Sequence, residues 1–285
     1  NYFTSVIRLI KKLKRVKYDI IHAHHTYCIY PIIISKFITR KRTPVILTFH
    51  EGEVHKTNNL KMNNVDFIKR LVFSKKIKIF ALNIVDFVIS VQEELIKELN
   101  FSGKYVILPC GVDLDLFRPL EKLWCREKLG LPLNKKIIFF PASPCNENKG
   151  FHILREGLKN VNWVNIEVVA AGNINHLDMP IYMCAADVIV QLSEWEASPM
   201  VLKEAMAVNI PVVFTDVGDA RFTVGDTPGC FLCRRDPCDV ASKLLVALNG
   251  NIISEGRNRI MESRLGLSDI GKNIISIYDS LLQNN

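Results

Sequence analysis

The stretch "DVIVQLSEWEASPMVLKEAMAVNIPVVFTD", residues 187–216, places a strand, a loop, a helix and a second strand in succession. Residues 187–192 and 211–216 are short apolar runs, which are typical of strands buried on both faces of a parallel sheet. Residues 200–208 between them have helical composition. A helix that connects two parallel strands is a βαβ unit, so this stretch predicts an α/β fold.

The same alternation extends along most of the chain and predicts a doubly wound α/β architecture. Further strands are expected at 18–23, 44–49, 86–91, 104–109, 135–141 and 166–171, and helices near 27–40, 64–83, 92–99, 151–159 and 237–249. The alternation pauses at 109–134, a stretch rich in Pro, Gly and charge that indicates a domain junction. Because no strand and Gly-rich turn precede Tyr18, we expect the first α/β domain to be incomplete.

Composition indicates a globular protein of one large or two ordinary domains. The chain has 285 residues, 48% of them hydrophobic and 23% charged, and no apolar run long enough to cross a bilayer. Its N-terminus lacks the apolar core and cleavage site of a signal peptide. The eight cysteines are scattered, so we expect free thiols in a reducing cytoplasm. Cys230 and Cys233 form a CxxC, but strand alternation would turn them to opposite faces, so we expect no metal site.

The net charge of +8 is concentrated at one end, with +11 over residues 1–105 and −3 over the remainder. Residues 8–17 and 69–80 have the pattern of basic amphipathic helices. Such helices can lie on an anionic membrane surface, and the alternative is a solvated lysine face. We expect no nucleic-acid partner, because no recognition motif accompanies the charge.

Candidate binding residues follow the predicted strands, because ligands of open α/β sheets bind at the carboxyl ends of the strands. His50 follows residues 44–49 and could face a cleft or lie in a surface loop. Lys149 lies near the start of a predicted helix, where a phosphate could bind. Gly172 and Asn173 form a turn that a base or ribose could approach closely. No P-loop and no GxGxxG motif is present.

The loop and helix of the opening stretch carry two glutamates, Glu196 and Glu204. Ser198 and Pro199 stand where an N-cap and a first helical residue belong. The segment would then offer an acceptor, a helix start with free N–H groups, and a second acceptor. A sugar, a diphosphate and a ribose need this order of groups. The alternative is a capped surface helix with two solvated glutamates.

Four motifs together resemble the retaining family 4 glycosyltransferases of GT-B fold. They are "PCGVDLDLFRP" (109–119), the loop at Lys149-Gly150, "MPIYMCAADVIVQLSEWEASPMVLKEAMAVNIPVVFTDVGD" (179–219) and "GCFLCRRDP" (229–237). The third of these is the most specific, and the resemblance extends from about Tyr18 to the end of the chain. Within the family, the chain is most similar to the branch of teichuronic-acid and other bacterial cell-surface polysaccharide enzymes.

The resemblance implies two Rossmann-like domains that face each other across a cleft, the first of them truncated. We expect an acceptor-side domain over 1–109, a nucleotide-sugar domain over 110–267, and a C-terminal helix over 268–285 that crosses back to the first domain. The family moves a sugar from a nucleotide-diphosphate donor to a glycan or lipid-linked acceptor with retention. It typically needs no metal or other cofactor. The expected location is the cytoplasm, with peripheral binding at the inner face of the plasma membrane.

The resemblance also assigns roles to individual residues. Glu196 would contact the donor sugar, Glu204 the ribose hydroxyls, Lys149 the phosphate, and His50 the region near the transferred sugar. The diphosphate would contact the backbone amides of Met200 and Val201, which follow Ser198-Pro199.

The chain departs from the family pattern at Asn146, where family members often have an arginine that would place a second cation on the leaving diphosphate. Two alternatives therefore remain beside the transferase. One is a non-catalytic homologue that binds a glycan or a partner enzyme, and the other is a nucleotide-sugar epimerase of the same fold.

Overall fold

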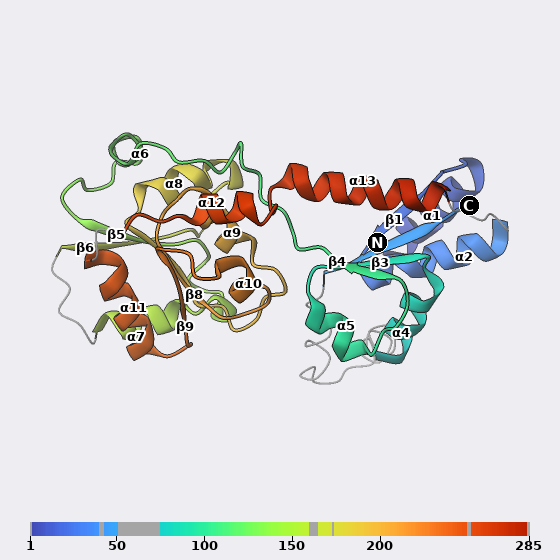
Figure 1. Cartoon of the computed structure of the whole chain (residues 1–285), viewed down its shortest axis with the longest axis horizontal. Helices are drawn as coiled ribbons and strands as arrows, with labels where there is room; N and C mark the ends of the chain where they lie inside the picture. Colours follow the sequence, from blue (N-terminus) through green and yellow to red (C-terminus); the bar gives the residue numbers. More distant parts are fainter. Residues whose placement is uncertain are drawn as a thin grey trace. The chain divides into compact units, whose positions relative to one another are not determined.

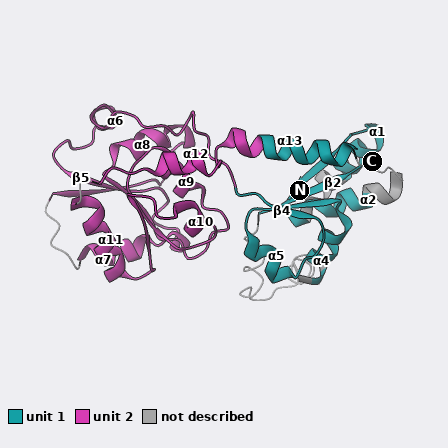
Figure 2. Cartoon of the chain, in the orientation of Figure 1, with its two compact units in different colours: residues 1–109, 272–285 teal, residues 110–271 magenta. Residues whose placement is uncertain are grey.

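The computed structural model describes residues 2–39, 43–50, 75–159, 165–172, 174–249 and 252–283. They form two compact units, one of residues 1–109 with 272–285 and one of residues 110–271 (Figures 1 and 2). The predicted helix near 64–83 lies partly outside the described residues, and so does Asn173.

The first unit contains a four-stranded parallel sheet in the order β1-β2-β3-β4. Its strands are β1 (Ile21–His24), β2 (Val45–Phe49), β3 (Phe87–Ser90) and β4 (Tyr105–Ile107). Its helices are α1 (Tyr2–Arg15), α2 (Ile29–Thr39), α4 (Lys75–Ile84), α5 (Glu93–Leu99) and most of α13 (Leu267–Gln283). Every residue of β2 is buried, as expected for a central strand of a parallel sheet with both faces covered.

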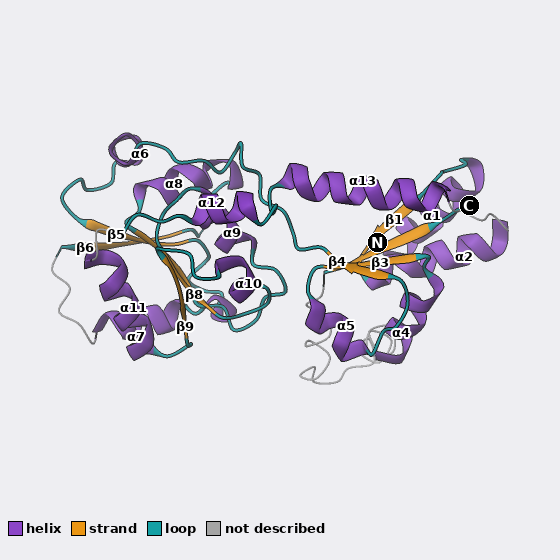
Figure 3. Ribbon diagram, in the orientation of Figure 1, coloured by secondary structure: helices purple, strands orange, loops and turns teal. Residues whose placement is uncertain are grey.

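The second unit contains a five-stranded parallel sheet in the order β6-β5-β7-β8-β9 (Figure 3). Its strands are β5 (Lys136–Phe140), β6 (Ile166–Ala170), β7 (Val188–Gln191), β8 (Val212–Thr215) and β9 (Cys230–Cys233). Its helices are α6 (Lys122–Leu129), α7 (Phe151–Lys159), α8 (Met179–Ala185), α9 (Met200–Ala207), α10 (Ala220–Val224), α11 (Pro237–Asn249) and α12 (Gly256–Glu262). The predicted α/β class is confirmed in both units.

The strand order of the second unit reverses direction at β5. The chain goes from β5 outward to β6, returns to the other side of β5 at β7, and continues to β8 and β9. A sheet of this kind has a topological switch point between β5 and β7, and a crevice opens there at the carboxyl ends of the strands. The loops that follow β5 and β7 are therefore the positions where a ligand site is expected.

Two apolar clusters cover the two faces of this sheet. Phe139 and Ile189 belong to the cluster with helices α8, α9 and α12, whereas Phe140 and Val190 belong to the cluster with α7 and α11. The CxxC pair follows the same alternation, because Cys230 packs against the first cluster and Cys233 lies in the second. The two thiols thus belong to opposite faces, as the alternation of β9 predicts.

The stretch 109–134, expected to interrupt the regular structure, contains helix α6. Its N-cap is Glu121, whose carboxylate accepts hydrogen bonds from the backbone N–H of Trp124 at 2.6 Å and of Leu123 at 3.0 Å. Arg126, on this helix, is buried and pairs with Asp187 at 2.7 Å. The helix was missed because it places an arginine where an apolar residue would be expected.

Candidate functional site

A cluster of charged and polar side chains lies at the switch point of the second unit. The Glu196 carboxylate accepts hydrogen bonds through Oε1 from Lys149 Nζ, from Ser193 Oγ at 2.9 Å and from Gln191 Nε2 at 3.3 Å. Lys149 follows β5, whereas the other three side chains come from the end of β7 and the loop beyond it. The Lys149 and Glu196 side chains are 22% and 20% exposed, so the pair is shielded but still accessible to a ligand.

The backbone holds the two loops of this cluster together. Leu192 N–H donates to Lys149 O at 3.1 Å, and Glu194 N–H donates to Asn148 O at 2.8 Å. Gly150 has a φ of 76°, and a Cβ at this position would lie only 2.4 Å from Leu192 O. Glycine is therefore required there on two grounds, the left-handed backbone and the close approach of β7. This contact between the loops brings the side chains of Lys149 and Glu196 together.

Glu204, on α9, forms a separate cluster with His176. Its side chain is only 6% exposed, and its Oε1 lies 3.1 Å from His176 Nε2. Burial raises the pKa of Glu204, while the hydrogen bond and the charge of His176 act in the opposite direction. His176 is itself 63% exposed and packs edge-on against Phe117. Glu204 is thus a buried acceptor behind one exposed imidazole, which a ligand could displace.

The start of α9 differs from the sequence-based prediction. Its N-cap is Pro199, without a side-chain cap, and Ser198 does not cap the helix as expected. Ser198 Oγ instead donates to Asp219 Oδ2 at 2.8 Å and accepts from Lys203 Nζ. The serine was predicted as a cap because its position before the helix is typical of one. The ion pair between Lys203 and Asp219 competes more strongly for the hydroxyl.

The buried Lys203 ties three parts of the second unit together. It is fully buried, and its Nζ contacts Asp219 Oδ2 at 2.7 Å and Cys110 O at 3.0 Å. Met200 and Val201, the first two residues of α9, follow directly after this network. The first N–H groups of a helix have no partner within the helix, so this anchored helix start can accept an anion.

The remaining predicted residues of the second unit, Asn146 and Gly172, have few contacts that bear on a site. Asn146 is the N-cap of a short 3₁₀ helix (Glu147–Lys149), and its backbone oxygen accepts from Lys149 N–H at 3.0 Å. Its side chain forms no cap hydrogen bond. Gly172 follows β6, and a Cβ there would meet open space, so no packing contact explains this glycine.

His50 belongs to a histidine cluster in the first unit. His50 Nε2 lies 2.9 Å from His24 Nδ1, and the ring of His24 stacks on that of His22 with centroids 4.6 Å apart. His22 in turn contacts Thr48 Oγ1 and the hydroxyl of Tyr278, each at 2.6 Å. The cluster thus joins the carboxyl ends of β1 and β2 to helix α13.

The histidines of this cluster favour the neutral form. Burial, together with the charge of the neighbouring imidazoles, lowers the pKa of His22 and of His50 to about 4. The pKa of His24 is also lowered, chiefly by burial. At neutral pH these rings can exchange hydrogen bonds with a ligand but carry no fixed charge.

Several residues of these clusters were not predicted from the sequence: Gln191, Ser193, His176, Lys203, Asp219, His22, His24 and Tyr278. Gln191 and Ser193 could have been found from the sequence. Gln191 is a polar residue at the end of an apolar strand, and Ser193, two positions later, is expected on the same face. Tyr278 gave no signal, because its partner His22 is 256 positions away.

The described residues contain no group of three or more His, Cys, Asp or Glu side chains placed to hold a metal ion. The arrangement of the second unit instead combines a lysine, an anchored helix start and two glutamates. These groups can bind a ligand that carries both phosphate and hydroxyl groups.

Comparison with known proteins gives matches over both units. The family model described as Glycosyltransferase Family 4 matches residues 1–116, and the model described as Glycosyl transferases group 1 matches residues 136–249. A relative in Bacillus subtilis, named for teichuronic acid biosynthesis (TuaC), is 26% identical over 73% of this chain. The match spans only 55% of that relative's length. An Escherichia coli relative, named UDP-Gal:alpha-D-GlcNAc-diphosphoundecaprenol alpha-1,3-galactosyltransferase, is 26% identical over 97% of this chain and 77% of its own length.

Solved structures share the fold over nearly the whole chain. The sucrose-phosphate synthase of Thermosynechococcus elongatus has a TM-score of 0.79 at 22% identity, with 99% of this chain and 79% of that one covered. Anabaena HepE, solved in complex with UDP-glucose, has a TM-score of 0.74 at 17% identity, with 96% and 82% covered. The two consecutive model matches thus identify a Glycosyltransferase Family 4 domain followed by a Glycosyl transferases group 1 domain, and the solved structures show that the chain has the GT-B fold.

Proposed function

We propose that the protein transfers a sugar from a nucleotide-diphosphate donor to a glycan or lipid-linked acceptor in bacterial cell-surface polysaccharide biosynthesis. The observation that carries this proposal is the contact of Lys149 with Glu196 at the switch point, beside the anchored start of α9. The named activities of the Bacillus subtilis and Escherichia coli relatives support the same class of reaction and pathway.

The donor would be distributed over three parts of the second unit. Glu204, buried and able to accept two hydrogen bonds, suits the ribose hydroxyls once His176 moves aside. The first N–H groups of α9 and the Lys149 ammonium suit the diphosphate. Glu196, already held by Ser193 and Gln191, suits a hydroxyl of the transferred sugar. The role of His50 near the transferred sugar stays a prediction from the resemblance, in which the imidazole would act in neutral form.

In the proposed reaction, the acceptor oxygen bonds to the anomeric carbon as the bond to the diphosphate breaks. The proton of the acceptor hydroxyl passes to a diphosphate oxygen, and attack from the face that the leaving group departs retains the configuration. The protein supplies position and charge, because stabilising the departing diphosphate lowers the barrier directly. Lys149 would bind the diphosphate after leaving Glu196 when the nucleotide sugar enters. Gln191 and Ser193 would still donate hydrogen bonds to Glu196 and keep its carboxylate in place.

The variant Glu204→Ala tests the donor site. Loss of a buried acceptor that pairs with two hydroxyls should abolish detectable binding of the nucleotide sugar in calorimetry. The exposed Glu156→Ala on α7 provides the matched control, since the Glu156 carboxylate pairs with Lys159 of the same helix. An affinity of Glu204→Ala equal to that of the unchanged protein would contradict the assignment of Glu204 to the donor.

We further propose that the first unit binds an anionic membrane surface, at the inner face of the plasma membrane, through α1. Lys11, Lys12, Lys14 and Arg15 are exposed on this helix, whereas Leu13 is buried within the protein. Attraction would thus be electrostatic at the surface, and none of the described helices is long and apolar enough to cross a bilayer. The protein should sediment with anionic vesicles at low salt and separate from them at high salt, whereas no sedimentation at low salt would contradict the proposal.

A non-catalytic role is the second candidate, and Asn146 is the observation that favours it. An arginine there would place a second cation near the diphosphate, whereas the asparagine adds none, and Lys149 is already paired with Glu196. Incubation with a panel of UDP-, GDP- and ADP-sugars and lipid-linked acceptors separates the two roles. Turnover of any donor would exclude the non-catalytic role, and nucleotide binding without turnover across the panel would favour it.

A further inference from the structure

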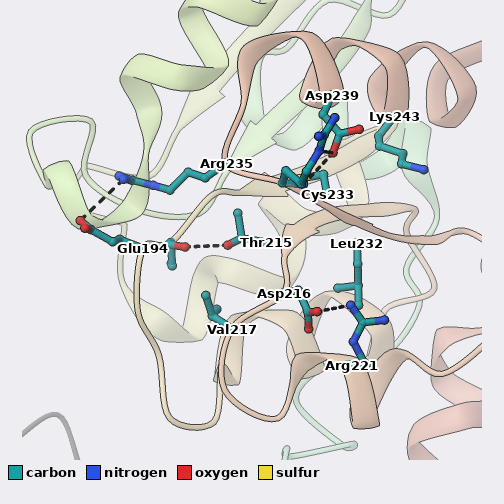
Figure 4. Close-up of a pocket in the computed structure, with 12 residues that line it drawn as sticks. Glu194, Thr215, Asp216, Val217, Arg221, Leu232, Cys233, Arg235, Asp239 and Lys243 are labelled. Atoms are coloured by element: carbon teal, nitrogen blue, oxygen red, sulfur yellow. Dashed lines mark hydrogen bonds and ion pairs between the residues drawn. The ribbon is translucent and has the colours of Figure 1, made fainter. Parts of the chain in front are cut away.

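The second unit has a pocket of about 490 Å³ beside the Lys149–Glu196 cluster (Figure 4). It opens at the carboxyl ends of β7, β8 and β9, and Ser193 lies in its wall. Ser193 also donates to Glu196, so the pocket and the cluster share one side chain. A volume of this size suits a single small ligand or one unit of a larger one.

Cationic side chains from three elements converge on the pocket. Figure 4 shows Arg235 with Glu194 on one side and Arg221 with Asp216 on the other, and Lys243 of α11 also lines it. Arg234 completes the set of four cations, against which stand three acids. Lys243 forms no ion pair within the part of the chain that the structure describes.

Arg235 is held rigidly, in contrast to the other cations of the rim. Its Nε donates to Leu192 O at 3.0 Å, and its Nη2 donates to Glu147 O at 2.9 Å. The side chain is 28% exposed, and its Nη1 remains 3.6 Å from Glu194, beyond ordinary hydrogen-bond distance. The guanidinium is thus oriented by the backbone, with one edge left to meet an anion.

Two of the three acids of the rim are weak competitors for these cations, whereas Asp216 holds Arg221 by a direct hydrogen bond. Glu194 is 70% exposed, and Asp239 lies 3.7 Å from Arg234 Nε while its Oδ2 accepts from the Arg234 backbone N–H at 2.6 Å. Exposed ion pairs contribute little free energy, so an incoming oxyanion can replace Glu194 at little cost.

The two hydroxyl groups that line the pocket each donate their proton within the protein. Ser193 Oγ donates to Glu196, and Thr215 Oγ1 donates to Ser193 O at 2.7 Å. Val217 and Leu232, which also line the pocket, are apolar. Recognition should therefore depend chiefly on the charged side chains of the lining, among which cations are in excess.

We propose that this pocket binds an oxyanion, a phosphate or carboxylate group carried on a saccharide, at a site separate from the proposed donor site. Arg235 is the fixed contact, and Lys243 provides adaptable charge beside it. The proposal does not depend on sugar transfer, because it concerns binding alone. An anionic group held here would lie beside the strand end that supports Glu196.

The test is calorimetric titration of the full chain with inorganic phosphate and with glucuronate, at constant ionic strength, with glucose as the neutral probe. The titrations are made in Lys149→Gln protein, so that the proposed donor site lacks its cation and competes less for phosphate. At least one anion should bind, and Arg235→Gln and Lys243→Gln should each weaken it about tenfold, the loss expected for one charge-assisted contact. Glu194→Gln should strengthen it, because a competing acid is removed.

Arg155→Gln is the matched control, since Arg155 is exposed on α7 and does not line the pocket. Binding of phosphate alone identifies a phosphate-bearing ligand, and binding of glucuronate alone identifies a carboxylate-bearing one. Equal binding of glucose, no binding of either anion, or binding insensitive to both Arg235→Gln and Lys243→Gln would overturn the proposal. Loss of nucleotide binding in Lys243→Gln, with Lys149 intact, would also overturn it, because the pocket would then be part of the donor site. Failure of the donor proposal alone would leave anion binding intact.

Discussion

The two units place different chemistry at the same position of similar sheets. At the carboxyl ends of β5 and β7 the second unit holds fixed charges, the ion pair of Lys149 with Glu196. At the carboxyl ends of β1 and β2 the first unit holds His24 and His50, which contact each other and favour the neutral form. One sheet edge is therefore suited to an anionic ligand, and the other to hydrogen bonding without charge.

This difference has consequences for how each unit responds to perturbation. Fixed charges are costly to bury, so the second unit depends on complete pairing of its charged groups. Neutral histidines cost less to bury but accept protons as the solution becomes acidic. Mutation should thus affect the second unit most strongly, whereas acid should act on the histidine cluster of the first.

The largest effect is expected from Lys203→Met. The ammonium of Lys203 is fully buried against Asp219, and its removal leaves a carboxylate buried with one hydroxyl partner, Ser198. Removing one member of a buried ion pair costs about 3–5 kcal/mol. Chemical denaturation followed by hydrogen exchange should show this loss in the second unit and little change in the first.

The double variant Lys203→Met with Asp219→Asn provides the control for that experiment. Removing the stranded charge should restore part of the free energy of unfolding. A single variant as stable as the unchanged protein would show that the second unit does not depend on this pair.

The next largest effect is expected from Lys149→Gln, on activity rather than on folding. Loss of the cation proposed to stabilise the departing diphosphate should lower kcat by about 10²–10³. The pair is partly exposed, so the free energy of unfolding should change little. Lys135→Gln is a suitable control, because the Lys135 ammonium pairs with Glu167 at the amino end of β5 and β6. Equal turnover of Lys149→Gln and Lys135→Gln would contradict the proposed role.

Much of the second unit could be predicted from its sequence, because its signals are local. The strand at 187–192, the helix at 200–208 and the strand at 211–216 correspond to β7, α9 and β8 with ends shifted by at most a residue. Lys149 and Glu196 could be placed at the carboxyl end of the sheet, since each lies in the segment that follows a strand. Their direct contact could not, because it depends on the approach of Gly150 to Leu192 between two loops.

The side-chain contacts that could not be predicted from the sequence are those between residues far apart in the chain. Ser198 has the sequence position of a helix cap, yet its hydroxyl joins the buried pair of Lys203 and Asp219. Local preference was overridden there by a charge whose partner lies 16 residues away. His22 and Tyr278 are a more distant case, since α13 must pack on the first unit before the two side chains can meet.

A smaller effect is expected from Gln191→Leu, which removes one of the three donors to Glu196. The side chain is buried and of similar volume to leucine, so the sheet should be retained. Loss of one hydrogen bond to a charged acceptor costs about 1.5–3 kcal/mol. The cost should lie at the low end here, because Lys149 and Ser193 still donate to Glu196. We expect kcat to fall about tenfold with the affinity for nucleotide unchanged, because Glu196 is proposed to contact the sugar and not the ribose. An equal loss of nucleotide affinity would show that Gln191 acts on the whole site.

The last effect is expected from pH and concerns the histidine cluster of the first unit. The pKa of His22 is about 4 in the folded protein, below the value of 6.5 for an ordinary histidine. As the pH falls through 6.5 the unfolded chain therefore takes up the proton first, and the stability present above pH 6.5 is progressively lost toward pH 4. His22→Gln should flatten this dependence in hydrogen exchange of β1 and β2, whereas His152→Gln, exposed on α7 of the second unit, should leave it unchanged. If β1 and β2 lose the same exchange protection on acidification in His22→Gln as in the unchanged protein, burial of His22 does not cause the acid response. That result would remove this part of the contrast between the two sheets.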